Sequence, residues 1–158
     1  MASFISNRFK YELASGKVNW AASSQFKAIL CYTTFSGNPD QDYVGDLTTL
    51  GEVTGTGYTS GYSGSGRKTI TGTLVQDETN DRAVLKIANL TWTAIDVGAT
   101  SCAGVLIYMH GIAHTGGTAS SDANAPVVAW LEFSASKRTN GEDFTVQFDQ
   151  TNGAITIS

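Results

Sequence analysis

Apolar and polar residues alternate along much of the chain, and a period of two is typical of β-strands that have one face in a core. The alternation is clearest where Thr145 and Gln147 separate Phe144, Val146 and Phe148. Similar patterns, or short runs of β-branched and aromatic residues, predict the other strands. These strands cover 18–20, 26–34, 68–75, 83–87, 90–94, 102–109, 127–133 and 155–157.

The run 102–109 is the longest uncharged apolar stretch, and we expect the protein to be organised around it. Its odd-numbered positions from Ala103 to Met109 share one face of a strand, and Leu106 and Tyr108 share the other. Both faces are apolar, which favours a strand at the centre of a covered sheet. The run is too short to cross a bilayer, because a membrane-spanning helix needs about 20 apolar residues.

One helix is expected, at the N-terminal end, because apolar residues recur at a spacing of about four over 4–15 and Gly16 suits a C-terminal cap. We divide the chain into an N-terminal arm or helix, residues 1–16, and a single β domain, residues 17–158. The predicted fold class is all-β: an antiparallel β-sandwich or partly closed barrel of about nine strands with one short N-terminal helix.

The connections between strands are predicted from turn residues. A hairpin is expected over 68–87, and Asn152-Gly153 is typical of another hairpin turn. The spacing of Thr49 and Glu52 suggests one helical turn near 46–52. The glycine-rich segment 55–66 is interpreted as a loop with exposed tyrosines, and 110–125 as a long surface loop.

Charge is low for a soluble domain and slightly acidic. Charged residues make up 15% of the 158 residues, and the net charge is −4. An acidic chain without a basic patch disfavours nucleic-acid binding. The first ten residues lack the basic start and apolar stretch of a secretory signal, so we expect synthesis in the cytosol and no membrane association. A weakly charged surface suits a protein that packs against neighbours.

The sequence predicts no metal or cofactor site. Cys31 and Cys102 are flanked by apolar residues and are expected to be buried free thiols. His110 and His114 have helical ligand spacing, but Gly111 and a glycine-rich segment indicate loop histidines. The acidic segment 40–46 resembles the start of a calcium-binding loop without completing it. We interpret that segment as a polar turn, and a calcium site of another geometry remains the alternative.

No catalytic motif is complete, and we expect no enzymatic activity. Gly57-Tyr58-Thr59-Ser60-Gly61 has threonine where a nucleophile elbow needs serine, and no helix follows it. The dinucleotide and phosphate-loop glycine patterns are absent. Nothing in the sequence places a nucleophile, a base and an orienting group together.

Several short blocks, in order along the chain, resemble small β-rich structural proteins encoded in the head and tail gene clusters of tailed bacteriophages. The blocks fall in 9–18, 52–59, 81–84, 90–92, 107–108, 141–146 and 152–155. The chain departs from the usual pattern at Met109-His110-Gly111, where a charged residue and glycine normally follow the tyrosine. The resemblance implies a non-enzymatic virion component, made in the host cytoplasm.

The resemblance and the composition together predict a capsid decoration, or cement, protein that stabilises the assembled shell. Its partners would be the major capsid protein or other virion subunits, and a homo-oligomer, as a trimer, is expected from the symmetry of a shell. The predicted partner-contact residues are Phe4, Ile5, Phe9, Tyr58 and Tyr62. The alternative for Phe4 and Phe9 is that they pack on the chain's own core.

A second hypothesis is a tail or fibre module that recognises a host-surface glycan. Trp20, Tyr58 and Tyr62 would then stack on sugar rings. A tail-tube or head-completion subunit is a third possibility, which the sequence does not separate from the first.

Overall fold

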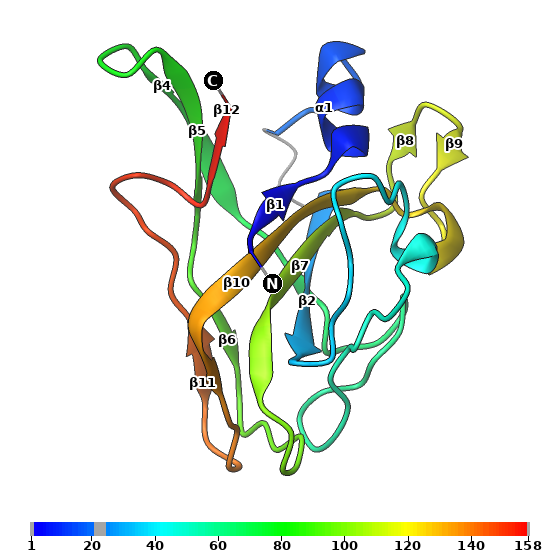
Figure 1. The fold of residues 1–158 in the computed structure, drawn as a ribbon, viewed down its shortest axis with the longest axis vertical. Coiled ribbons are helices and arrows are strands. Elements are labelled where there is room, and N and C mark those ends of the chain that lie inside the picture. Colours follow the sequence, from blue (N-terminus) through cyan, green and yellow to red (C-terminus); the bar gives the residue numbers. More distant parts are fainter. Residues whose placement is uncertain (1, 21–24, 158) are drawn as a thin grey trace.

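The fold is mostly β and consists of several antiparallel sheets, none of which closes into a barrel within the described residues. The computed structural model describes residues 2–20 and 25–157. The largest sheet has the strand order β1-β10-β7-β2-β3. Its strands are β1 (Phe4–Ile5), β10 (Val127–Lys137), β7 (Cys102–Met109), β2 (Phe26–Tyr32) and β3 (Lys68–Thr69). Figure 1 shows this sheet at the middle of the molecule.

The central position of β7 is confirmed. It pairs with β10 on one side and β2 on the other, and it is buried on both faces. Val105, Ile107 and Met109 contribute to one hydrophobic cluster, and Leu106 and Tyr108 contribute to the other, as predicted. Ala103 was expected on the same face as Val105 but packs on the opposite one. A β-bulge, where Tyr32 pairs with Cys102 rather than with Ala103, causes this change of face.

One face of the main sheet is covered by strands. The sheet β12-β5-β4 comprises β12 (Ile155–Ile157), β5 (Arg82–Ile87) and β4 (Gly72–Asp77), and β6 (Leu90–Trp92) pairs with β11 (Phe144–Val146). Both smaller sheets supply side chains to the core formed with β2 and β7. The largest of these is Trp92, which is fully buried, as expected for a core anchor.

Loops cover the opposite face of the main sheet. They come from 33–66 and 110–125 and include η2 (Val44–Asp46), η3 (Asp122–Asn124) and the short pair β8 (Ala113–His114) and β9 (Gly117–Thr118). Their apolar residues form a second core with the sheet, in which the rings of Phe35 and Trp130 stack 4.0 Å apart. The expected loop over 110–125 is therefore a packed layer with some regular structure of its own.

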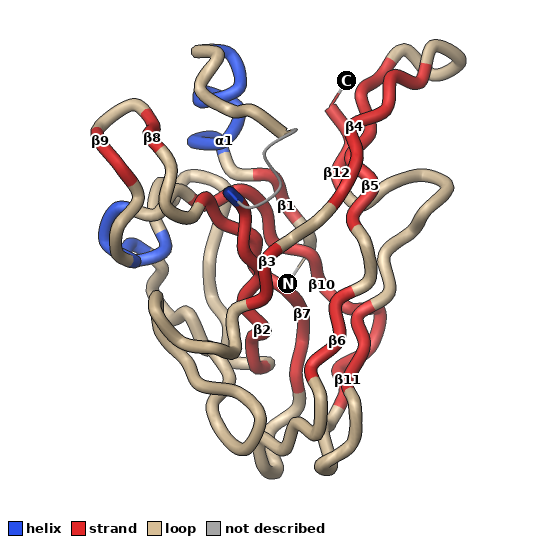
Figure 2. The backbone as a smooth tube through the Cα atoms, turned by 180° about the vertical axis from the view of Figure 1, so that it is seen from behind, coloured by secondary structure: helices blue, strands red, loops and turns tan. Residues whose placement is uncertain are grey.

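The N-terminal prediction is wrong in its first residues. Phe4 and Ile5 are a strand that pairs with Trp130 and Ala129, and the helix α1 begins later, spanning Asn7–Ala14. Ser6 explains the boundary, because its extended backbone and its side-chain oxygen, which accepts from the backbone N–H of Phe9, form an N-cap. Figure 2 shows α1 at one end of the molecule, beside the β8–β9 pair.

Several other local predictions are corrected. Residues 18–20 are not a strand, 46–52 contains no helical turn beyond η2, and the expected strand over 68–75 is divided into β3 and β4. The hairpin over 68–87 is confirmed for β4 and β5. Asn152-Gly153 does not join a hairpin, since β11 pairs with β6 and β12 pairs with β5. No helix in the described part of the chain has the length and apolar content to cross a bilayer.

Candidate partner-binding groove

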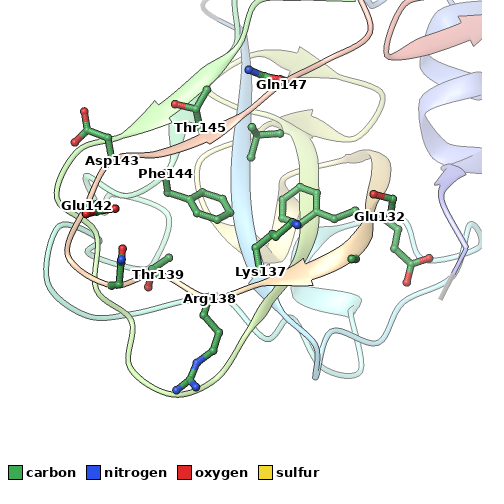
Figure 3. Close-up of a pocket in the computed structure, with 14 residues that line it drawn as sticks. Glu132, Lys137, Arg138, Thr139, Glu142, Asp143, Phe144, Thr145 and Gln147 are labelled. Carbon is green, nitrogen blue, oxygen red and sulfur yellow. The ribbon is translucent and has the colours of Figure 1, made fainter.

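A broad concavity lies between the outer half of β10 and β11 (Figure 3). It has a volume of about 830 Å³ and is lined by β10, β11 and the turn 138–143 that joins them. Phe133 and Phe144 form an apolar pair there, with ring centroids 6.2 Å apart. Figure 3 shows the ring of Phe144 pointing from β11 into this space. We call this feature the β10–β11 groove.

The wall of the groove is held to the core by hydrogen bonds from the turn 138–143. The backbone N–H of Val97 donates to Thr139 Oγ1 at 2.9 Å, and that of Ala94 donates to Asp143 Oδ1 at 3.0 Å. Phe144 also lies 6.4 Å from the buried ring of Trp92, which is its partner across the ladder. The groove is therefore a preformed feature rather than a gap between independent loops.

The backbone of β10 along the groove lacks strand partners. On one edge, β1 pairs only with Ala129 and Trp130. On the other edge, the register with β7 is interrupted between Glu132 and Lys137. In the described residues, no ladder pairs with 133–136, which are largely exposed. Unpaired N–H and C=O groups on an exposed strand can accept an added strand from another chain.

Charges of both signs surround the apolar pair. Lys137 and Arg138 lie at the end of β10, and Glu142 and Asp143 lie where β11 begins. In the described structure, neither Lys137 nor Arg138 forms an ion pair with an acidic side chain. The residues lining the groove include no histidine or cysteine. This set of side chains suits polypeptide recognition, with an aromatic floor, a mixed-charge rim and an open main chain.

A buried ion cluster under the loop layer was not predicted. Arg67, whose side chain is fully buried, binds Glu52 and Asp122 through paired hydrogen bonds and lies 5.2 Å from the ring of Tyr108. Burial disfavours the charged guanidinium, but the hydrogen bonds to Glu52 and Asp122 outweigh it and raise the pKa of Arg67. Burial also raises the pKa of Tyr108 to about 12. The cluster therefore holds Glu52 and Asp122, which belong to two separate loops, against the main sheet.

The three predicted partner-contact residues at the N-terminal end differ in how deeply they are buried. Phe4 and Ile5 are half-buried in β1, and Phe9 is 1% exposed in the main core. Phe9 therefore matches the alternative in which it packs on the chain's own domain. None of the three lines the β10–β11 groove, and contact with a partner through them stays a prediction.

The two loop tyrosines are less exposed than expected. Tyr58 is 2% exposed, and its hydroxyl donates to Glu52 Oε1 at 3.2 Å and accepts from the backbone N–H of Leu30. Tyr62 is half-buried, and its hydroxyl donates to the carbonyl of Ala119. The expectation of an exposed Tyr58 is wrong, because its side chain packs in the main core with its ring centroid 6.4 Å from that of Trp92.

The residues considered for sugar or metal binding have separate partners. Trp20, which the glycan hypothesis places against a sugar ring, stacks on Phe26 with ring centroids 4.1 Å apart. His110 lies beside Tyr62, with ring centroids 4.4 Å apart, whereas His114 lies near Arg8. Among the described residues, no three His, Cys, Asp or Glu side chains are grouped as a metal site.

The carboxylates of the segment 40–46 also contact protein groups rather than a shared centre. Asp40 accepts from the side-chain amide of Asn7 at 2.7 Å, and Asp46 accepts from the backbone N–H of Tyr43 at 3.0 Å. Asp42 lies 3.8 Å from Arg8. These carboxylates therefore point to different protein partners, as in a polar turn.

No family model, curated protein or solved structure matches the chain.

Proposed function

We propose that this chain is a non-enzymatic structural protein of a tailed-bacteriophage particle, a decoration protein that binds the assembled capsid shell. The proposal starts from the order of sequence blocks that resemble small phage head and tail proteins. The architecture we assign to it is a two-layered antiparallel β-sandwich with loops covering its outer face. A rigid body of this kind suits a protein that holds neighbouring subunits in place.

The observation that carries the proposal is the unpaired stretch 133–136 of β10 beside the Phe133–Phe144 pair. An extended segment of a capsid subunit can pair with this backbone while its alternate side chains contact the aromatic rings. The cations Lys137 and Arg138 and the anions Glu142 and Asp143 then fix its direction. The major capsid protein is the proposed source of this segment.

The buried cluster around Arg67 supports the same role. It fixes two loops to one sheet through charged hydrogen bonds, and its carboxylates are engaged by Arg67 itself. Charge-assisted hydrogen bonds of this kind are stronger and more directional than neutral ones. We assign this cluster to the stiffness of the body rather than to chemistry on a substrate.

Co-sedimentation with capsid shells tests the proposal. Shells of the encoding phage, prepared without this chain, are mixed with the purified protein and pelleted. We expect saturable binding, and the double charge reversal Lys137→Glu/Arg138→Glu should weaken it by about tenfold or more, equivalent to about 1.4 kcal/mol.

The matched control is the double charge reversal Lys10→Glu/Lys17→Glu, which makes the same change in net charge at two exposed positions outside the groove. It should bind as the unaltered protein does. Absence of binding to shells by the unaltered protein would contradict the decoration role. Equal binding by the groove variant and the control would contradict the assignment of the groove.

A further inference from the structure

Exposed apolar side chains gather on the small sheet β12-β5-β4. Among the described residues, four large apolar side chains are exposed, and three of them, Leu74, Val75 and Ile157, belong to this sheet. Leu74 is 55% exposed. Leu74 and Ile157 border an apolar hollow of about 260 Å³ between the sheet and α1. Figures 1 and 2 both show the β4–β5 hairpin extending beyond the body.

The main chain of β4 has one paired side and one open side. The carbonyl of Thr71 accepts from the N–H of Ala88, and the register runs on to Asp77 opposite Arg82. Because antiparallel pairing alternates, residues 73, 75 and 77 direct their N–H and C=O groups toward β5. Gly72, Leu74 and Gln76 therefore direct theirs toward the open side. No strand pairs with that side in the described part of the chain.

This edge lacks the features that usually prevent pairing with another chain. Protected edge strands carry lysine, proline or a bulge. β4 has the sequence Gly-Thr-Leu-Val-Gln-Asp, and its register with β5 is uninterrupted. Its single charged residue, Asp77, is paired with Arg82 at 2.7 Å. An open, regular and apolar edge of this kind favours strand addition.

The geometry points to a second copy of this chain as the occupant: β4 pairs antiparallel with β4 of the other copy across a two-fold axis. With Leu74 opposite its own counterpart, Gly72 lies opposite Gln76, so all three outward-directed residues are in hydrogen-bonded pairs. The two small sheets then form one continuous sheet, with the apolar hollows on the same face.

The charges of the hairpin agree with this arrangement. The turn after β4 is acidic, with Glu78 and Asp81, whereas Lys68 precedes β4. In the antiparallel dimer, the acidic turn of one copy extends toward Lys68 of the other. The two acidic turns lie at opposite ends of the joined strands, so they do not repel each other. A parallel arrangement would place like charges side by side.

This contact differs from the trimer expected from the sequence. A two-fold contact is isologous, with the same patch on both copies, whereas a trimer needs two different patches in head-to-tail contact. The inference goes beyond shell binding and does not depend on it, because β4 and the β10–β11 groove are separate surfaces.

Disulfide trapping tests the pairing, with Leu74→Cys as the diagnostic variant. A residue opposite its own counterpart in a hydrogen-bonded pair has a Cα–Cα distance of about 5.5 Å, which permits a disulfide. We expect more than half of this variant to become a covalent dimer under mild oxidation. Gln76→Cys is the matched control on the same edge and face, and it should remain uncrosslinked because it lies opposite Gly72. The two native thiols are buried.

Light scattering provides the second readout, on protein without added cysteines. We expect a dimer that Leu74→Lys converts to a monomer, whereas Tyr11→Lys, at the fourth exposed apolar side chain, leaves it unchanged. A monomer at every concentration, a trimer, or equal crosslinking of the two cysteine variants would overturn the inference. If the unaltered protein is a monomer and Leu74→Lys loses shell binding, the β4 edge contacts a capsid subunit instead of a second copy. That result would also overturn the inference.

Discussion

Arg67 and Glu52 form a two-point pair in which Nε donates to Oε1 at 2.9 Å and Nη2 donates to Oε2 at 2.7 Å. The Arg67 side chain is fully buried, and that of Glu52 is 7% exposed. Arg67→Met removes the cation and leaves Glu52 buried without its counter-charge. We expect the free energy of unfolding to fall by about 3–5 kcal/mol, measured by urea denaturation.

The companion variant is Arg82→Met, which breaks a partly exposed pair with Asp77. It should lower the free energy of unfolding far less, because water and salt screen an ion pair at the surface. Replacing both charges of the buried pair, with Glu52→Gln added to Arg67→Met, should recover part of the loss. An Arg67→Met variant no less stable than Arg82→Met would contradict a stabilising role for the cluster.

His110 should make the protein less stable in mild acid. Burial lowers the pKa of His110, and the positive charges of Lys27 and Arg67 lower it further. The unfolded chain, in which the pKa is about 6.5, then binds a proton more readily than the folded chain. Stability is therefore lost as the pH falls through about 6.5, until the folded-state pKa is reached.

This titration can be followed by NMR, because the chain has only two histidines. The His110 ring signal, assigned by its disappearance in His110→Phe, should titrate below pH 6.5. The same variant should also have a flatter stability profile between pH 7 and pH 5. A midpoint for His110 above 6.5, or an unchanged profile, would contradict the prediction.

The two cysteines should be unreactive in the folded protein. Both are buried and free, and burial raises the pKa of each thiol, that of Cys102 to about 11. The reactive thiolate is therefore scarce at neutral pH. We expect less than about one tenth of the thiol signal from Ellman's reagent before denaturation and the full signal after it. The denatured sample is the internal control, and rapid labelling of the native protein would show that the core opens near Cys31 or Cys102.

Gly104 should not tolerate a side chain. A Cβ atom there would lie 2.5 Å from the carbonyl oxygen of Leu131 and 2.6 Å from the ring of Trp130. We expect Gly104→Ala to lower the melting temperature and to cost about 1–3 kcal/mol, as overpacking does in other cores. Ala135→Ser adds one atom at an exposed position in β10 and should stay within about 0.5 kcal/mol of the parent. Equal stability of the two variants would contradict the close approach of β10 to β7.

The strands that were predicted correctly are those whose own sequence determines them. The run 102–109 has apolar residues on both faces, and β7 has the predicted bounds and central position. The alternation was misleading only near Ala103, because the bulge depends on how β2 pairs with β7. The hairpin of β4 and β5 was also found, because both strands and the turn are adjacent in sequence.

The errors have local causes that compete with the general pattern. Phe4 and Ile5 fit a helical spacing, but the N-cap at Ser6 separates them from α1. Asn152-Gly153 is a common hairpin turn, yet the strands on either side pair with β6 and β5 instead of with each other. In these cases tertiary pairing outweighs a short-range signal.

The candidate groove and the ion cluster could not be predicted from local patterns. Arg67, Glu52 and Asp122 come from three distant segments, and each is an ordinary charged residue in its own neighbourhood. Phe133 and Phe144 were both assigned to strands, but the break in the β10 register that exposes the groove depends on β7. The one local signal was the position of Arg67 directly after the uncharged, glycine-rich segment 55–66, although Lys68 beside it has the same charge.

The pairing of β1 with β10 has a consequence for how the protein is made. Phe4 lies opposite Trp130, so β1 has no partner in the main sheet until β10 has been synthesised. At roughly 5–20 residues per second, the delay is roughly 6–25 s. During translation, Phe4 and Ile5 are therefore available to chaperones. The main sheet is therefore completed only after β10 has been synthesised.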